Sequence, residues 1–277
     1  MSYDLMFSAG NGKKLDKKAF KAYFRDRRNY QLGEGQAIYQ NEDTGVYFIF
    51  DEPDNGVVAF NLNYFRPHIF GLEAAPELEQ FAEAFAAIVT DPQGEIEDPG
   101  TFRREPFLRG WNAGNQFAYR AMLKEQTGPV YTWPSQRIRA VWEWNYLRST
   151  EQERVGENVF VPAIFVVEMS GEILSMAIWP PDCAILLPAV DAVLVPLAQA
   201  GKQSEELAPV RWGEVLPIVQ PYLEDGAGLA RYLLAFEKWP DQITEFLTRE
   251  RSAMEGTNGI PLDQLLDQEL VAEAQKS

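Results

Sequence analysis

The side chains best suited to nucleophilic or acid–base chemistry are a single histidine, His68, and a single cysteine, Cys183. A hydrolytic triad needs a histidine beside a serine or cysteine and an acid, and nothing in the spacing around His68 indicates that arrangement. Cys183 follows Asp182, whereas a reactive thiolate is favoured by a cationic neighbour or a helix N-terminus. We therefore expect His68 to be a packed, hydrogen-bonded residue and Cys183 to be a buried structural one.

Carboxylates are abundant, and several of them lie in two acidic turns. These turn residues are Glu42, Asp43, Asp51, Glu52 and Asp54. Such residues could in principle bind Ca²⁺ or supply an acid–base pair. The chain lacks the EF-hand spacing, however, and it has no GxGxxG, GxxxxGK[ST], HExxH or CxxC motif. The sequence thus predicts no metal site and no cofactor, and it favours a protein that is not an enzyme.

The net charge of −16 is unevenly distributed along the chain. Residues 1–33 carry eight Lys/Arg against three Asp, whereas residues 34–98 carry fourteen Asp/Glu against Arg66 alone. An acidic field of this size disfavours nucleic acid and anionic membranes as partners, and it speeds encounter with a basic protein. Solubility is an equally good explanation, because net charge governs colloidal behaviour before it governs partners.

Neither a membrane span nor a secretory signal is expected. The longest apolar runs, 159–167 and 185–197, fall short of the roughly 20 residues that cross a bilayer. The N-terminus places its charges after its apolar residues, which is the reverse of a signal peptide. A single cysteine excludes an intrachain disulfide and fits a reducing compartment. We expect a cytoplasmic protein without membrane contact.

The best-defined secondary structure is a meander of three strands over residues 36–64, in which aromatic and β-branched runs are separated by acidic turns. A short strand over 3–8 and an amphipathic helix over 15–24 precede it. A helix over 76–89 follows it, with Pro76 in the first turn. The order β-α-β-β-β-α predicts an α+β fold, with an N-terminal antiparallel sheet that carries helices on one face.

The segment 91–100 has turn residues and charge but no apolar periodicity, so we expect a domain boundary there. It separates an α+β sheet domain over 1–92 from a mixed region over 101–277, which could also be continuous with the first domain. In this region we expect a β-hairpin around 170–171 and a helical C-terminus from 203 onward. The expected helices cover 107–125, 134–148, 212–223, 227–236, 241–251 and 261–274. The expected strands cover 158–169, 172–179 and 185–196.

Two segments, 41–48 (NEDTGVYF) and 61–73 (NLNYFRPHIFGLE), resemble poorly characterised bacterial proteins associated with interbacterial toxin systems, in the manner of immunity proteins. Weaker similarity covers 142–146 and 160–162. The resemblance brings no catalytic residues. It implies a protein that neutralises a toxin by covering or distorting its active site, and acidic surfaces suit basic toxin domains such as nucleases.

The leading hypothesis is therefore a cytoplasmic, non-catalytic protein whose acidic turns bind a basic toxin or effector domain. The predicted partner-binding residues are Glu42, Asp43, Asp51, Glu52 and Asp54, with Tyr47 or Tyr64 as an aromatic anchor.

Two other hypotheses come from different classes. The first is an enzyme or ligand-binding protein with a pocket between the two halves of the chain, lined by Trp111, Asn115, Trp142 and Trp144. The second is an effector chaperone or adaptor, which predicts an exposed hydrophobic groove instead of an acidic patch. The sequence does not indicate an oligomeric state.

Overall fold

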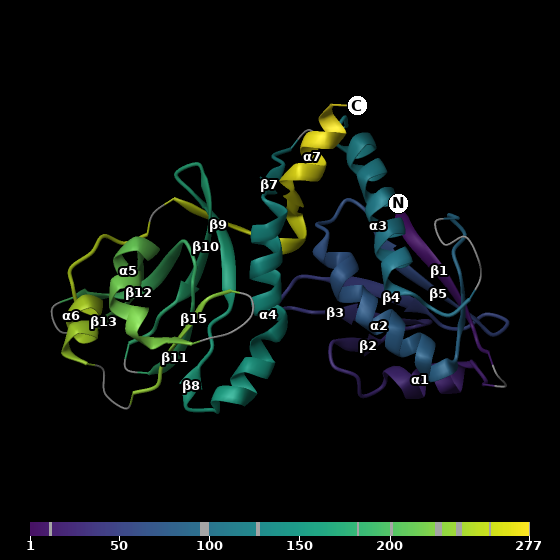
Figure 1. Ribbon diagram of the computed structural model, residues 1–277, viewed down its shortest axis with the longest axis horizontal. Coiled ribbons are helices and arrows are strands. Elements are labelled where there is room, and N and C mark those ends of the chain that lie inside the picture. Colours follow the sequence, from purple (N-terminus) through teal and green to yellow (C-terminus); the bar gives the residue numbers. More distant parts are fainter. Residues whose placement is uncertain are drawn as a thin grey trace. The chain divides into compact units, whose positions relative to one another are not determined.

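The chain forms two compact units in the computed structural model (Figure 1). The structure describes residues 1–10, 13–94, 100–125, 128–181, 183–199, 202–224, 229–236, 240–254 and 256–276. Unit 1 comprises residues 1–138 together with the C-terminal segment 263–277, and unit 2 comprises residues 139–262. This division differs from the expected one. The predicted boundary at 91–100 falls within unit 1, and its residues 95–99 lie outside the described part of the chain.

The core of unit 1 is a six-stranded sheet in the order β2-β3-β4-β5-β1-β6, in which all neighbours are antiparallel. Its strands are β1 (Ser2–Ser8), β2 (Tyr30–Leu32), β3 (Gln36–Gln40), β4 (Tyr47–Asp51), β5 (Val57–Asn63) and β6 (Ile88–Thr90). The predicted meander is confirmed as β3-β4-β5. β1 pairs with β5 and extends the sheet, while β2 and β6 add a short strand at each edge.

Three helices cover one face of this sheet, which we call the inner face (Figure 1). They are α1 (Lys17–Phe24), α2 (Ile69–Phe85) and α3 (Arg104–Met122). Phe24 of α1 and Phe81 of α2 lie against Phe50 of β4, with ring centroids 5.1 and 5.0 Å away. Phe107 of α3 contacts Phe60 of β5. These aromatic contacts confirm the predicted antiparallel sheet with helices on one face.

α2 begins earlier than predicted, at Ile69 instead of Pro76. Pro76 therefore lies inside the helix, where it removes one backbone N–H donor, and is not a first-turn residue. The helix ends at Phe85, and the left-handed backbone of the next residue, Ala86 (φ 46°), turns the chain. The residues that follow form β6, so the expected last helical turn is a strand.

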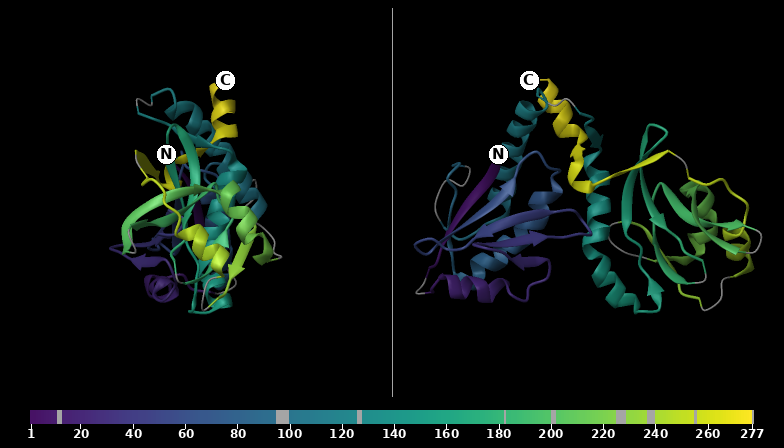
Figure 2. Two further views of the ribbon diagram at one scale, coloured as in Figure 1. Left: turned by 90° about the vertical axis from the view of Figure 1, so that its left-hand side faces the viewer. Right: turned by 180° about the vertical axis from the view of Figure 1, so that it is seen from behind.

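The C-terminal segment belongs to unit 1. β17 (Leu265–Asp267) pairs in parallel with β7 (Tyr131–Trp133), and α7 (Gln268–Gln275) packs beside α3 (Figure 2). A small apolar core joins these elements, formed by Tyr119, Leu266, Val271 and Ala274. The predicted helical C-terminus is confirmed at α7, but residues 265–267 are a strand and not part of that helix.

Unit 2 contains a five-stranded sheet in the order β13-β12-β10-β9-β16 and a four-stranded sheet in the order β14-β15-β11-β8. Their strands are β8 (Val159–Phe160), β9 (Ile164–Met169), β10 (Glu172–Ile178), β11 (Ala184–Pro188), β12 (Ala192–Gln199), β13 (Lys202–Arg211), β14 (Leu223–Glu224), β15 (Arg231–Leu234) and β16 (Thr257–Ile260). The helices are α4 (Ser135–Val155), which starts in unit 1, α5 (Trp212–Val219) and α6 (Asp241–Leu247). Short 3₁₀ helices cover Gln220–Tyr222 and Leu262–Gln264.

The hairpin predicted around residues 170–171 is confirmed as β9-β10, with Ser170 and Gly171 at φ 55° and 81°. The helix predicted over 227–236 is wrong at 231–234, which form β15, while 227–228 lie outside the described residues. β13, β14 and β16 also lie in or overlap the region from residue 203 onward that we expected to be helical, so that expectation is wrong for these strands. β15 pairs with β11, which is distant in the chain, whereas β13 pairs with the preceding strand β12, and in both cases the pairing outweighs local propensity. Among the described residues, no helix is both long and apolar enough to cross a bilayer.

Candidate functional site

The strands of the unit 1 sheet turn every second side chain away from the three helices, toward what we call the outer face. Its centre is apolar and consists of Met6, Ile38, Ile49 and Ala59. The strand register places Ile38 opposite Ile49 and Met6 opposite Ala59. All four are half-exposed, whereas their neighbours along the strands are buried on the inner face. The outer face is thus a partly apolar surface in contact with solvent.

Two carboxylates flank this apolar centre. Asp4 pairs with Asn61, which in turn pairs with Ile49, and Asp51 ends β4 two residues after Ile49. Asp4 accepts a hydrogen bond from Ser2, and Asp51 accepts one from Gln36, each at 3.0 Å. Neither carboxylate has an ion-pair partner within 4.0 Å among the residues that the structure describes. Their charges are therefore available to a cation from outside the chain.

The structure separates the five acidic residues that we predicted as one contact. Glu42 and Asp43 follow β3 and precede β4, so they lie at one end of β4, whereas Asp51, Glu52 and Asp54 lie at the other end. β4 has five residues, and at about 3.4 Å per residue its ends lie roughly 14 Å apart. The two acidic turns therefore border the sheet at opposite ends and do not form a single patch.

The tips of these turns remain in solvent. Glu42 and Asp54 are exposed, and Asp43 is half-exposed with Arg28 at 4.0 Å. This contact between a mostly exposed arginine and a turn carboxylate contributes little to stability, because water screens it. Glu42 and Asp54 are thus the turn acids best placed to meet a partner.

Glu52 points to the inner side of the sheet, because it directly follows the outer-face residue Asp51. Its carboxylate binds Lys17 at 3.0 Å and Lys21 at 2.8 Å, both on α1. The hydrogen bonds from Lys21 and Lys17 hold the pKa of Glu52 below its ordinary value. Glu52, which we predicted as a contact for a partner, therefore forms its ion pairs with the basic helix α1 within unit 1.

The two tyrosines predicted as anchors also lie on different sides of the sheet. Tyr47 is half-exposed on the outer face, and its hydroxyl accepts hydrogen bonds from Arg66 Nη2 at 2.6 Å and Nε at 3.1 Å. Tyr64 is half-buried on the inner side, stacked on Trp111 with ring centroids 5.3 Å apart and packed against Gly114. Tyr47 therefore borders the outer face, and Tyr64 is a packing residue of α3.

The four residues predicted to line a pocket between the halves belong to two different units. Trp111 and Asn115 lie on α3 in unit 1, and both are fully buried. Trp142 and Trp144 lie on α4 in unit 2 and are buried there, with Trp144 Nε1 donating to the Pro162 carbonyl at 2.8 Å. Each pair is packed inside its own unit. A shared pocket stays a prediction.

Asn115 has a specific role in supporting the loop from Phe65 to His68, between β5 and α2. Phe65 has φ 61°, a left-handed backbone that is uncommon for an aromatic residue. The side chain of Asn115 accepts from the Phe65 N–H and donates to the Arg66 carbonyl, each at 2.7 Å. The Tyr119 hydroxyl donates to the same carbonyl at 2.9 Å. Buried side chains of α3 thus hold the strained loop in one conformation. Strained backbone that is held in place in this way is typical of functional sites.

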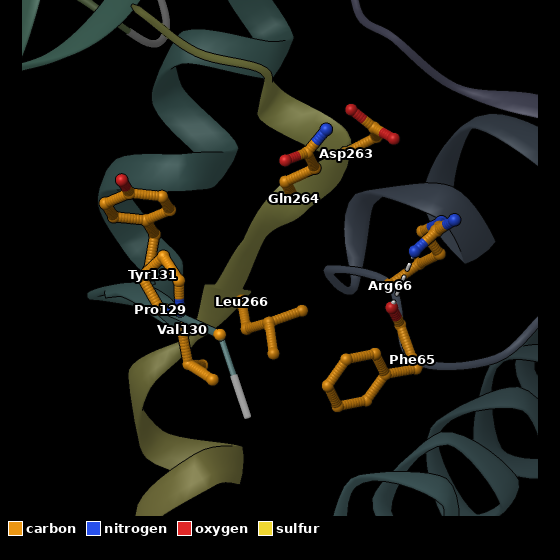
Figure 3. Close-up of a pocket in the computed structure, with 9 residues that line it drawn as sticks. Phe65, Arg66, Pro129, Val130, Tyr131, Asp263, Gln264 and Leu266 are labelled. Atoms are coloured by element: carbon orange, nitrogen blue, oxygen red, sulfur yellow. Dashed lines mark hydrogen bonds between the residues drawn. The ribbon is translucent and has the colours of Figure 1, made fainter. Parts of the chain in front are cut away.

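This loop forms one wall of a pocket of about 300 Å³ within unit 1 (Figure 3). Phe65 and Leu266 point toward one another across it, and Arg66 and Asp263 add opposite charges to its lining. Burial raises the pKa of Asp263, although the positive charge of Arg66 opposes this shift. The complete lining consists of Phe65, Arg66, Gly128, Pro129, Val130, Tyr131, Asp263, Gln264 and Leu266.

His68 closes the same loop by binding Asp267. Its Nδ1 lies 2.5 Å from Asp267 Oδ1, and its backbone N–H donates to Oδ2 at 2.7 Å. Asp267 is fully buried at the end of β17, so the pair joins the start of α2 to the C-terminal segment. The prediction of a hydrogen-bonded His68 is confirmed. Cys183 is half-buried and not buried as predicted, with Sγ 3.7 Å from the Pro180 carbonyl oxygen.

A second buried carboxylate, Glu73 of α2, also serves the architecture. Its Oε1 accepts hydrogen bonds from Tyr39 at 2.8 Å, Asn41 at 2.7 Å and Thr44 at 3.1 Å. Asn41 and Thr44 belong to the turn between β3 and β4, so Glu73 fixes this acidic turn to α2. Burial, and next the charge of Glu73, raises the pKa of Tyr39. The acidic turn between β3 and β4 is therefore held in place by a buried polar cluster whose hydrogen bonds are satisfied.

The outer face and the pocket beside Phe65 are the two candidate sites of unit 1. In the part of the chain that the structure describes, no three His, Cys, Asp or Glu side chains are grouped so that they could hold a metal ion. No protein-family model, curated protein or solved structure matches the chain.

Proposed function

We propose that this protein is a non-catalytic binding protein of the bacterial cytoplasm, and that it is an immunity protein whose outer face covers a basic toxin domain. The observation that supports this most directly is the outer face itself. Its apolar centre is half-exposed, and the flanking charges of Asp4 and Asp51 have no basic partner among the described residues. The resemblance of segments 41–48 and 61–73 to immunity proteins agrees with this function.

The arrangement of the outer face suits a protein partner. Protein interfaces have an apolar centre that is dry in the complex and a polar rim that stays wet, with most of the binding energy in a few central residues. Ile38 and Ile49 supply such a centre, and the tyrosine at its border, Tyr47, adds an aromatic side chain of the kind that is enriched in interfaces. We therefore expect Ile49 to be an anchor and Asp4 and Asp51 to be rim charges.

The acidic charge around the outer face indicates which class of protein it can bind. Some of the fourteen acids of residues 34–98 are buried or paired, as Glu52 is with α1, but Asp4 and Asp51 on the outer face have no ion-pair partner among the described residues. Such a field attracts a positively charged protein and accelerates its association. It repels phosphate backbones and anionic lipid. A toxin domain with a basic, substrate-binding surface is the partner that fits.

The test uses the product of the adjacent upstream gene as the probe. Expressed alone in a bacterial host, it should stop growth, and co-expression of the wild-type chain should restore growth. The double variant Asp4→Lys/Asp51→Lys and the single variant Ile49→Arg should each weaken binding of the purified probe about tenfold or more, and rescue should fall accordingly.

The matched control is Glu157→Lys, which reverses an exposed acid of unit 2 and should leave affinity and rescue unchanged. Circular dichroism and urea unfolding confirm that each variant is folded. Wild-type affinity in both outer-face variants would rule out this surface. A probe that neither harms the host nor binds the wild-type chain would rule out the immunity function for this pair of genes.

A further inference from the structure

The pocket beside the Phe65–His68 loop is chemically different from the outer face (Figure 3). We propose that it binds a free α-amino acid with an apolar side chain, with Arg66 receiving the carboxylate and Asp263 receiving the ammonium group. This inference goes beyond the binding of a protein partner, and it stands independently of it.

Arg66 has donors left for a carboxylate. The guanidinium has five N–H donors, and three are used in hydrogen bonds to the Tyr47 hydroxyl and the Phe65 carbonyl. Two N–H donors therefore remain. Both acceptors are neutral, and the part of the chain that the structure describes places no carboxylate within 4.0 Å of the guanidinium. The positive charge of Arg66 is thus held in place but not neutralised.

Asp263 supplies the opposite charge to the same pocket. It is half-buried and, among the described residues, it has no cation within 4.0 Å. The turn at Gly45 lies next to it, because a Cβ at Gly45 would come within 3.6–3.9 Å of the Asp263 backbone nitrogen, Cβ and Oδ1. A half-buried carboxylate is stabilised by a bound cation, and an ammonium group with three donors satisfies it. A zwitterion therefore matches both charges at once, whereas an ion of either sign matches only one.

The remaining residues that line the pocket determine which kind of side chain the ligand can carry. Phe65, Val130 and Leu266 form an apolar wall, and Figure 3 shows Phe65 and Leu266 directed at each other across the space between them. Ligand pockets typically combine apolar walls with a few placed polar groups and measure about 300–1,000 Å³. At about 300 Å³ this pocket is at the lower end of that range. It suits one small molecule and excludes a nucleotide-sized cofactor.

The loop is already ordered in the conformation that forms the pocket. Asn115 and Tyr119 hold the strained backbone of Phe65 and the carbonyl of Arg66, and Asp267 holds His68. A binding site that is rigid before the ligand arrives loses less conformational entropy on binding. The strain at Phe65 is therefore explained by its role in placing Arg66 at the pocket.

The experiment titrates the full-length protein with leucine, methionine and phenylalanine by calorimetry, with thermal shift as a second readout. N-acetyl-leucine, which lacks the ammonium charge, and leucine methyl ester, which lacks the carboxylate, are the comparison ligands. We expect at least one of the three amino acids to bind, and each blocked form to bind about tenfold more weakly or worse, because each loses one charged contact. The proposal is overturned if none of the amino acids binds at about ten millimolar, or if a blocked form binds equally well.

Two variants locate the binding. Asp263→Asn should weaken amino-acid binding about tenfold or more while leaving N-acetyl-leucine unchanged. Val130→Trp should abolish binding by filling the pocket, without altering either charge. The matched control, Asp54→Asn, removes the same charge from an exposed turn and should bind like the wild type. Wild-type affinity in folded Val130→Trp protein would show that any binding occurs elsewhere.

Discussion

On β4, Phe48 and Phe50 point to the inner face and are buried, whereas Tyr47, Ile49 and Asp51 point to the outer face and are half-exposed. The buried rings continue into a dense aromatic cluster with α1 and α2. The outer side chains have few such partners. One strand thus stabilises the fold with one set of residues and presents a chemically mixed surface with the alternate set.

The same contrast applies to charge. On the inner side Glu52 is paired with two lysines, and Glu73 is satisfied by three hydrogen bonds. On the outer side Asp4 and Asp51 are hydrogen-bonded only to neutral groups among the described residues. The number of acidic residues therefore overstates the charge that a partner meets. The face on which each carboxylate lies decides whether it is available.

The largest expected effect compares two adjacent residues of β4. Phe50→Ala should lower the free energy of unfolding by about 3–5 kcal/mol, because it leaves a cavity in the aromatic cluster. Ile49→Ala should cost only about 1 kcal/mol, because its side chain is half-exposed. Urea unfolding measures both. Equal losses would show that the outer face is as tightly packed as the inner one.

A smaller effect is expected from adding volume to the inner side. Gly114→Ala should destabilise unit 1 by about 1–3 kcal/mol, because the new methyl group would overlap the ring of Tyr64. The control is Gly56→Ser, in a turn where no neighbouring atom lies within 4 Å and only the positive φ opposes the change. Adding Tyr64→Ala to Gly114→Ala should cost less than the sum of the two single variants, since the overlap disappears. Additive losses would contradict the packing role of Tyr64.

The smallest effect concerns Glu52 and depends on pH. Its pKa is lower in the folded protein than its ordinary value of 4.5, because Lys21 and Lys17 favour the charged form. The stabilisation is therefore fully present above pH 4.5 and is lost as the pH falls through the lower, folded pKa. Glu52→Gln should be less stable than the wild type at neutral pH, and the difference should shrink on acidification below pH 4.5. The variant Asp51→Asn, on the outer face, should show no comparable loss at neutral pH.

Several strands of both units could be predicted from local patterns. The period of two in the meander and the glycine-containing hairpin turns predicted β3, β4, β5 and the β9-β10 hairpin, and the structure confirms them. These predictions succeeded because the strands pair with sequence neighbours. Two of the errors occurred where pairing is distant, although β13 was missed despite pairing with its sequence neighbour β12. β15 was predicted as helix although it pairs with β11, and residues 265–267 were predicted as helix although they pair with β7. Local propensity contains no information about such partners.

The candidate sites show the same limit. The acidic turns and Tyr47 were visible in the sequence, but strand alternation and turn direction decided that Glu52 and Tyr64 face inward. The apolar centre of the outer face arises only when four residues from the four strands β1, β3, β4 and β5 are brought into register, as Met6 meets Ala59 and Ile38 meets Ile49. No linear motif marks that surface.

The sequence by itself determined the strongly acidic character of residues 34–98, the α+β class and the strand meander at its centre. These properties follow from composition and short-range periodicity. Only the tertiary structure decided which acids are neutralised, and only it placed Asp263 and Arg66 in the lining of one pocket and Asp267 against His68. The physical reason is that burial, ion pairing and pocket formation depend on contacts between segments far apart in the chain, here 199 residues for His68 and Asp267.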